Sequence, residues 1–184
     1  MNNKNQNDNF AKYFHQLCEE SERGSAIVGA ALIDDALKEM LKALMVESTK
    51  KDDELFKNSY APLNSLSAKI DFTYRMGLIS KEVRTSLHII QKIRNSFAHV
   101  SCQISFETQL IQDRVQTLFN LNKSILNLMW EIIENNFKCK FDNLINNIGW
   151  IMTYNLLISI ILTTMHEMKT NIPRIISHHQ DGEN

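Results

Sequence analysis

Apolar residues recur at spacings of three and four along most of this 184-residue chain, which is the period of a helix with one buried face. Valine, isoleucine and leucine do not alternate with polar residues, as they would in a half-buried strand. Only two prolines, Pro62 and Pro173, and five glycines are available to interrupt the pattern. The pattern therefore predicts an all-α protein that folds as a single helical bundle.

The same pattern predicts where the helices lie. Residues 22–25 are expected to join the first two helices, and Gly77 to end the third, while Gly149 is a second glycine where a helix can be interrupted. Ser80 is expected to cap the fourth helix, because its hydroxyl can accept a free backbone N–H of the first turn. The expected helices cover residues 9–21, 26–41, 65–76, 80–99, 109–135 (with room for a break) and 141–169.

Both ends of the chain are polar. Residues 1–9 are rich in asparagine and lack the apolar core of a signal peptide, so we expect a disordered tail there. Residues 171–184 are expected to form a polar C-terminal tail. Residues 10–170 then make up one domain, which is long enough to enclose a hydrophobic core.

One stretch is apolar enough to raise the question of a membrane. Residues 143–165 contain no Lys, Arg, Asp or Glu, and about 20 apolar residues suffice to span a bilayer. Asn155, Ser159 and Thr163 interrupt this run, and we expect a helix of the bundle core, with a membrane span as the alternative. The face expected to pack against the bundle carries Trp150, Tyr154, Leu157 and Ile161, and the polar residues lie on the opposite face.

The overall composition limits the classes of partner. Twenty Lys and Arg against 21 Asp and Glu give a formal net charge of -1, so any binding of nucleic acid must use a local basic patch. The three cysteines, Cys18, Cys102 and Cys139, have neither the spacing of a disulfide framework nor a CxxC pair. Reduced thiols are typical of a cytoplasmic protein, which is where we expect the chain to work.

The segment from Ile93 to His99 carries the candidate chemistry. Asn95 and His99 are four residues apart and so share a face of a helix, and the long side chain of Arg94 can reach the same place. A guanidinium that binds phosphate beside an imidazole that moves a proton can cut RNA without a metal. We therefore predict Arg94, Asn95 and His99 as catalytic residues.

A structural role for the same residues is the alternative. Arg94 would then pair with an acidic side chain of another helix, Asp34 or Asp35, and His99 would cap the end of its helix. Neither aspartate belongs to a cluster with metal-ligand spacing, and the sequence has no phosphate-binding or dinucleotide-binding glycine motif. The sequence therefore predicts no metal and no cofactor.

Several blocks in the first half of the chain resemble one bacterial family. They are Glu22–Val28, Leu32–Asp35, Ala61–Ile70 and Tyr74–Ile79, and in this order they are similar to the mannitol operon repressor family over about residues 10–100. That resemblance implies an all-helical fold and a role in transcription regulation. Because the sequence has no helix-turn-helix pattern with a basic second helix, such a regulator would act through protein contacts.

A second resemblance rests on Arg94–His99, with four residues between the arginine and the histidine at the end of a long helix. It is similar to the motif of ribonucleases in the HEPN superfamily of helical domains. The resemblance implies a HEPN-like bundle that forms a homodimer, bringing two motifs into one cleft. It also implies RNA as substrate, and an antitoxin or a phage-defence protein as partner.

These observations lead to one expected function and two alternatives. We expect a HEPN-like, metal-independent endoribonuclease or RNA-binding effector, working as a toxin or a phage-defence component. The first alternative is a non-enzymatic regulator of transcription, similar to the mannitol repressor family. The second is a membrane-associated effector that uses the apolar helix near the C-terminus.

Overall fold

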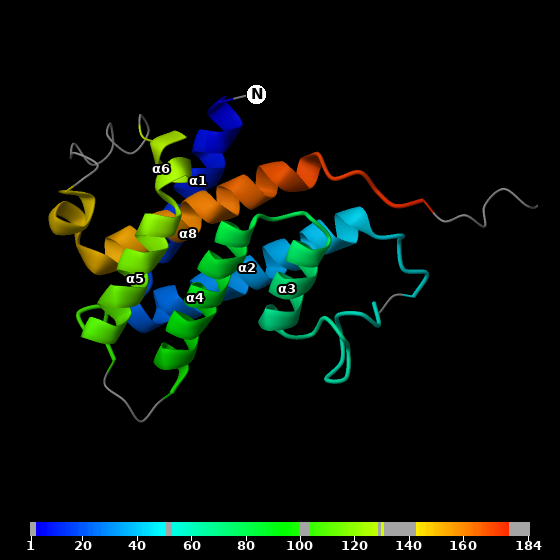
Figure 1. Ribbon diagram of the computed structural model, residues 1–184, viewed down its shortest axis with the longest axis horizontal. Coiled ribbons are helices and arrows are strands. Elements are labelled where there is room, and N and C mark those ends of the chain that lie inside the picture. The colour runs from blue at the N-terminus through cyan, green and yellow to red at the C-terminus, as the bar shows by residue number, and fades with distance from the viewer. Residues whose placement is uncertain (1–2, 51–52, 100–103, 129, 131–142, 177–184) are drawn as a thin grey trace, which may run out of the picture.

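The computed structural model describes residues 3–50, 53–99, 104–128, 130 and 143–176, which form an all-α bundle without a strand (Figure 1). This confirms the predicted fold class. The helices are α1 (Asn3–Cys18), α2 (Glu22–Leu44), α3 (Leu66–Arg75), α4 (Lys81–Ala98), α5 (Gln109–Leu121), α6 (Lys123–Leu128) and α8 (Leu144–Thr170).

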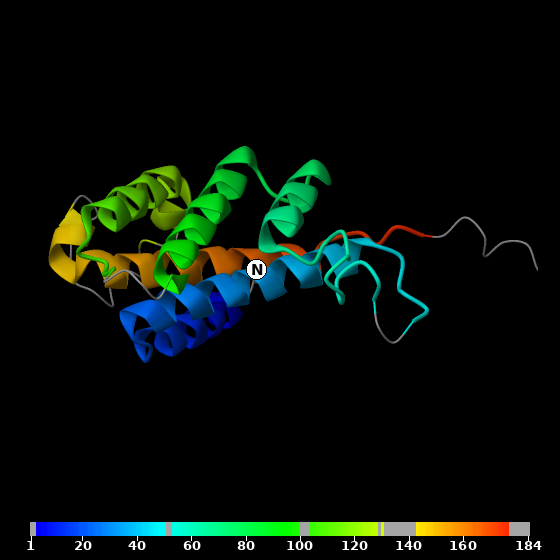
Figure 2. The same cartoon turned by 90° about the horizontal axis from the view of Figure 1, so that it is seen from below.

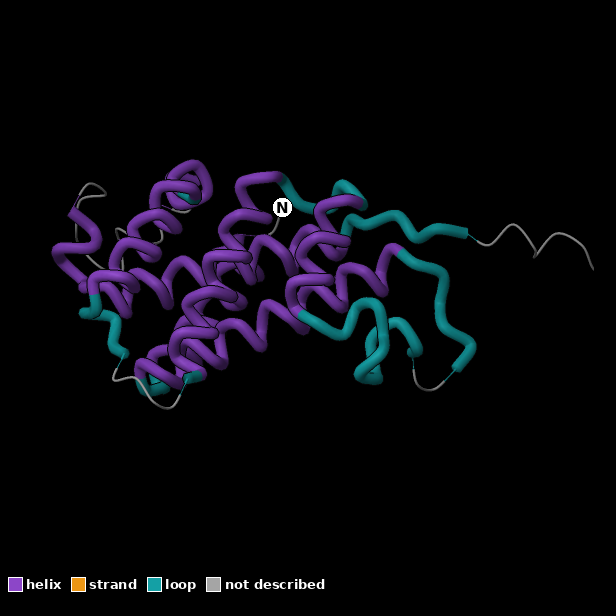
Figure 3. The backbone as a smooth tube through the Cα atoms, turned by 60° about the horizontal axis from the view of Figure 1, so that its bottom comes forward, coloured by secondary structure: helices purple, strands orange, loops and turns teal. Residues whose placement is uncertain are grey.

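The helices are arranged in layers around α2 and α8. Figure 2 shows α3, α4 and α5 on one side of this pair and α1 on the other. Helix α8 contacts α1, α2, α5 and α6, and α4 contacts α2, α3 and α5. The connection from α2 to α3 and the segment after α8 leave the bundle at the same end (Figure 3), where the backbone N–H of Ile175 donates to the carbonyl of Leu44 at 2.7 Å.

Three of the helices begin at a serine. The hydroxyls of Ser21, Ser65 and Ser80 each accept the backbone N–H of the residue three positions later, which satisfies one free donor of the first turn. The predicted cap at Ser80 is confirmed. Because Ser21 also caps a helix, residues 22–25 form the first turn of α2, and the predicted joint there is wrong.

Helix α1 begins earlier than the sequence predicted. Residues 3–9, expected to belong to a disordered tail, are helical in the structure, and residues 1 and 2 lie outside the part that it describes. The spacing of apolar residues predicts that Phe10, Phe14 and Leu17 face inward; Phe10 and Leu17 are buried, and Phe14 is half-buried against the core.

The expected break in the long helix after Gln109 lies at Asn122. This side chain is buried, and its Nδ2 donates to Ser86 Oγ at 2.9 Å and to the carbonyl of Leu118 at 2.7 Å. An amide that bonds to a nearby carbonyl competes with the regular helix, so α5 ends there and α6 begins at Lys123. The predicted continuation over residues 131–135 lies outside the described residues.

Helix α8 is buried on all sides over its central stretch. Every residue from Thr153 to Thr163 is buried, including Asn155, Ser159 and Thr163, so the bundle covers both faces rather than one. The hydroxyls of Ser159 and Thr163 donate at 2.7 Å to the carbonyls four residues earlier, which explains how they enter the core. Trp150, expected in the core, is only half-buried.

The described residues contain one helix long and apolar enough to cross a membrane, and it is α8, in which a window of 18 residues has a mean hydropathy of 1.6. In the structure 67% of that window is buried inside the bundle. The expected interruption at Gly149 is present, because this residue has a φ of 78° and kinks the helix.

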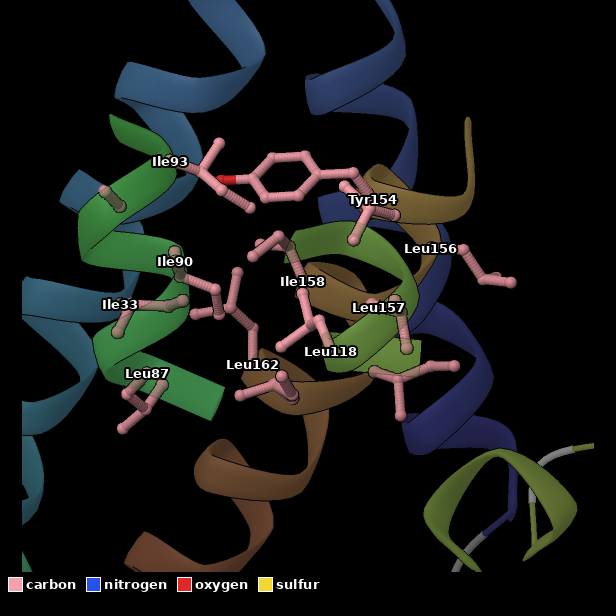
Figure 4. Close-up of a cluster of buried hydrophobic side chains, with 14 of the residues drawn as sticks. Ile33, Leu87, Ile90, Ile93, Leu118, Tyr154, Leu156, Leu157, Ile158 and Leu162 are labelled. Atoms are coloured by element: carbon pink, nitrogen blue, oxygen red, sulfur yellow. The ribbon is translucent and has the colours of Figure 1, made fainter. Parts of the chain in front are cut away.

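Tyr154 places a polar group at the centre of the core. Its ring centroid lies 5.0 Å from that of Phe106, and Figure 4 shows the hydroxyl directed toward Ile93 of α4. No described residue lies within hydrogen-bonding distance of this buried hydroxyl. Burial also raises the pKa of Tyr154 far above the ordinary value, so the hydroxyl stays protonated.

The Tyr154→Phe variant is expected to be more stable than the natural chain. The substitution removes a buried hydroxyl that lacks an acceptor, which should raise the free energy of unfolding by about 1 kcal/mol. Chemical denaturation followed by circular dichroism measures this difference. Tyr13→Phe on α1, where the side chain is half-buried, is the control and should change little. A loss of stability in Tyr154→Phe would show that the hydroxyl makes a favourable contact.

Candidate functional site

The candidate residues lie where three helices meet. The carboxyl end of α4 lies near the amino ends of α2 and α5, at the lower left of Figure 1. Ile93 and Phe97 anchor this end of α4 in the core, and the ring centroids of Phe97 and Phe106 are 5.0 Å apart. The residues between these anchors therefore point outward.

Arg94 and Asn95 are both exposed, and they lie together. The Nη1 of Arg94 donates to Asn95 Oδ1 at 3.1 Å, so the amide holds the guanidinium on the outer side of the helix. Both side chains line an open groove of about 440 Å³ between α2, α3 and α4. The rest of its lining consists of Ile27, Ala30, Ala31, Asp34, Asn64, Ser65, Leu66 and Gln91.

His99 lies at the end of the same helix but not in the groove lining. Helix α4 ends at Ala98, one residue before the predicted end, and His99 is its exposed C-cap with φ -74° and ψ 113°. Because φ keeps a helical value and only ψ departs from one, the side chain still leaves the helix on the side of Asn95. The structure thus brings Arg94 and Asn95 together in the groove. His99 is exposed at the C-cap of α4, outside the groove lining.

The ion pair expected under the structural alternative does not form. The carboxylate of Asp34 accepts two hydrogen bonds, at 2.6 and 2.7 Å, from the Nζ of Lys69, whose side chain is buried. Asp35 lies on another side of α2, against α8. Within the described part of the chain, Arg94 therefore has no carboxylate partner, and its only hydrogen bond joins it to Asn95.

The end of α4 is bound by an arginine that the sequence analysis did not single out. Arg23 of α2 donates from Nη2 to the carbonyl of Ala98 at 3.3 Å, so this residue, and not the ring of His99, satisfies a free carbonyl of the last turn. Cations are favoured at this end of a helix. His99 thus occupies the C-cap position of α4, as the structural alternative expected, but the hydrogen bond to the carbonyl of Ala98 comes from Arg23.

A second arginine approaches α4 from its other flank. Arg114 of α5 donates from Nη1 to the carbonyl of Lys92 at 3.1 Å and to Ser96 Oγ at 2.7 Å. Lys92 itself is exposed. Sequence spacing could not reveal this arrangement, because Arg23, Lys92 and Arg114 come from three different helices.

Another histidine of α4 is committed to a separate contact. His88 Nε2 lies 3.1 Å from Asp71 Oδ1, and Arg84 Nε donates to the same oxygen at 2.8 Å. The hydrogen bonds from Arg84 and then from His88 lower the pKa of the Asp71 carboxyl. Asp71 thus stays ionised and holds both side chains. His99, at the C-cap of α4, makes no polar contact with a described residue.

No group of three or more potential metal ligands occurs among the described residues. The side chains of Arg94, Asn95 and His99 at the end of α4 supply a cation, an amide and an imidazole. Such a set can bind a phosphate and move a proton. Comparisons of the chain with models of known protein families, with curated proteins and with solved structures find no match.

Proposed function

We propose that the chain is a HEPN-like, metal-independent endoribonuclease or RNA-binding effector whose site lies at the carboxyl end of α4. The observation that carries this proposal is the setting of Arg94, which is exposed, lines an open groove and bonds only to Asn95 among the described residues. A guanidinium without a carboxylate partner is available to bind a phosphate. His99 adds an exposed imidazole, the side chain that most often moves protons in catalysis.

The proposed reaction uses the nucleophile that RNA already contains. The ribose 2′ oxygen attacks the adjacent phosphorus, and the bond from phosphorus to the 5′ oxygen breaks, which gives a 2′,3′-cyclic phosphate and a 5′-OH. A base takes the proton of the 2′-OH, and an acid gives a proton to the departing 5′ oxygen. His99 serves in one of these roles, while Arg94 stabilises the charge on the phosphate and Asn95 orients the guanidinium.

One chain supplies one His99, whereas the reaction needs both a base and an acid. A twofold dimer that brings two segments 94–99 to one cleft provides the pair. We therefore expect light scattering at micromolar concentration to give about twice the chain mass of 21.3 kDa. A monomer mass would contradict this prediction, as would a dimer structure with the two segments on opposite outer faces.

We place this chemistry in a toxin or phage-defence setting, in which a partner restrains the cleavage of cellular RNA. An antitoxin or another defence protein is the partner that we propose. The second candidate function is a regulator that acts through protein contacts. It is favoured by exposed apolar side chains at the opposite end of the bundle, of which Tyr60 is 96% and Ile176 78% exposed.

Incubation of the purified full chain with total RNA in the presence of EDTA tests the proposal. We expect fragments from the natural chain, and none from Arg94→Gln, which removes the phosphate-binding cation but no described ion pair. Intact RNA with the natural chain would favour the regulator. Cleavage that EDTA abolishes would contradict a reaction without metal.

A further inference from the structure

Several cationic side chains from three helices lie around the carboxyl end of α4. Arg23 and Arg94 lie on the flank that faces α2, and Arg114 lies on the flank that faces α5. Lys92 is exposed between the two flanks. We call Arg23, Lys92, Arg94 and Arg114 the basic collar.

The members of the collar form no ion pair with a described carboxylate. The carboxylates adjacent to two of them in sequence keep their charge but hydrogen-bond to neutral groups: Glu22 Oε2 accepts the backbone N–H of Phe106 at 2.9 Å, and Asp113 Oδ1 accepts from Gln109 at 2.7 Å. The four cations of the collar outnumber these two carboxylates, so this end of α4 has a local excess of positive charge in a chain of net charge -1.

The contacts that position the two flanking arginines leave most of their donors free. A guanidinium has five N–H donors, and the contacts of Arg23 and Arg114 each use a single terminal nitrogen. The carbonyls of the last turns thus hold these side chains in place, while the remaining donors stay available to a ligand. The side chain of Lys92 is exposed and forms no ion pair with a described residue.

We propose that the basic collar binds the backbone of single-stranded RNA, with Arg23, Lys92 and Arg114 on the phosphates that flank the one held by Arg94. This inference rests on the proposed function and adds the form of the substrate and three binding residues. Four cations that form no described ion pair suit a ligand with repeated phosphates.

The groove beside the collar favours an unpaired strand. Its lining includes the apolar side chains of Ile27, Ala30 and Ala31 and the amides of Gln91 and Asn95. A base that is free of a duplex can place its face on apolar side chains and its edge against amides. A base inside a duplex exposes neither its face nor its pairing edge.

Binding of an uncleavable RNA separates this inference from catalysis. A labelled single-stranded RNA of about 12 nucleotides, methylated at every 2′ oxygen, is titrated with full chain between about 50 and 200 mM salt. Each lost phosphate contact should lower the slope of log affinity against log salt by about 0.7, which is about fivefold in affinity at 0.1 M salt. We expect this change for Lys92→Gln, and no change for Lys12→Gln, an exposed lysine of α1 on the far side of α2 from α4.

Charge-retaining variants separate binding from a purely structural role of the arginines. Arg23→Lys and Arg114→Lys keep the cation but alter the contacts with α4, so they should keep the salt slope even if the melting temperature falls. Arg23→Gln and Arg114→Gln should each lower the slope as Lys92→Gln does. If the glutamine and lysine variants have equal slopes, the arginines only support the helix and the inference is overturned.

The outcomes for the inference and for the proposed function differ. If the natural chain cleaves RNA but Lys92→Gln binds the methylated RNA as tightly as Lys12→Gln, the basic collar does not bind RNA, and the proposed function is unaffected.

If the salt slopes change as expected and no RNA is cleaved, the basic collar binds RNA, and the proposed enzymatic function is wrong. If the natural chain does not bind the methylated RNA, the inference that the basic collar binds RNA is wrong. If a duplex of the same sequence binds as tightly or more tightly, the inference that the substrate is single-stranded is wrong.

Discussion

Replacement of His99 by alanine is expected to leave the bundle folded and to lower the rate of RNA cleavage by about a hundredfold to ten-thousandfold, the range for loss of a general acid or base. The side chain is exposed at the end of α4 and makes no described hydrogen bond, so its removal costs the core nothing. Cleavage of a labelled RNA measures the rate, and the growth of cells that express each variant provides a second readout. Growth inhibition by the natural chain should disappear with His99→Ala.

His166→Ala is the matched control for this experiment. His166 is also exposed, but it lies on α8 beside α1 and α2, away from the end of α4. This variant should cleave RNA as fast as the natural chain. If His99→Ala is equally active while circular dichroism reports the same helix content, His99 has no part in the reaction.

A chain that ends at residue 140 is expected not to fold and to aggregate. Such a chain lacks α8, whose central residues are buried against α1, α2, α5 and α6. Without this helix, the apolar faces of its neighbours are exposed to water, and each large apolar side chain that loses its cover costs about 1.5–3 kcal/mol. The free energy of unfolding of a typical domain is about 5–15 kcal/mol. The loss of cover from only a few large apolar side chains therefore costs more than the whole stability of such a domain.

A chain that ends at Ile176 is the control for this truncation. It keeps all of α8 and the hydrogen bond between Ile175 and Leu44, so we expect this chain and the full chain both to purify without detergent. Size-exclusion chromatography and circular dichroism distinguish the two forms. A monodisperse, helical chain ending at residue 140 would mean that α8 is dispensable for the core, and it would favour contact between this helix and a membrane.

Much of the fold could be predicted from the sequence because local rules determine most helices. The spacing of apolar residues located the helices, Ser80 and Gly77 set two of their ends, and Gly149 interrupts α8. The start of α2 was misplaced because Ser21, an effective cap, precedes residues without a strong apolar pattern. The burial of both faces of α8 follows from the packing of four other helices on it, which periodicity along one segment does not reveal.

The candidate site shows the same division between local and distant information. Arg94, Asn95 and His99 are close in sequence, so the contact of Arg94 with Asn95 and the place of His99 at the end of α4 were predictable. The pairing of Asp34 with Lys69 was not, because a buried lysine on another helix gives no sequence signal of its own. The approach of Arg23 and Arg114 likewise depends on how α2 and α5 cross α4.

The most direct test of the account is the chemical identity of the ends that the protein leaves on RNA. The full chain is incubated in EDTA with an unmodified single-stranded RNA of defined sequence, and the products are identified by mass spectrometry. We predict fragments with a 2′,3′-cyclic phosphate, or the phosphate from its hydrolysis, and a 5′-OH, and no cleavage at a position that carries a 2′-deoxyribose. Intact RNA, or fragments with 5′-phosphate and 3′-OH ends, would contradict metal-independent attack by the 2′ oxygen at the end of α4.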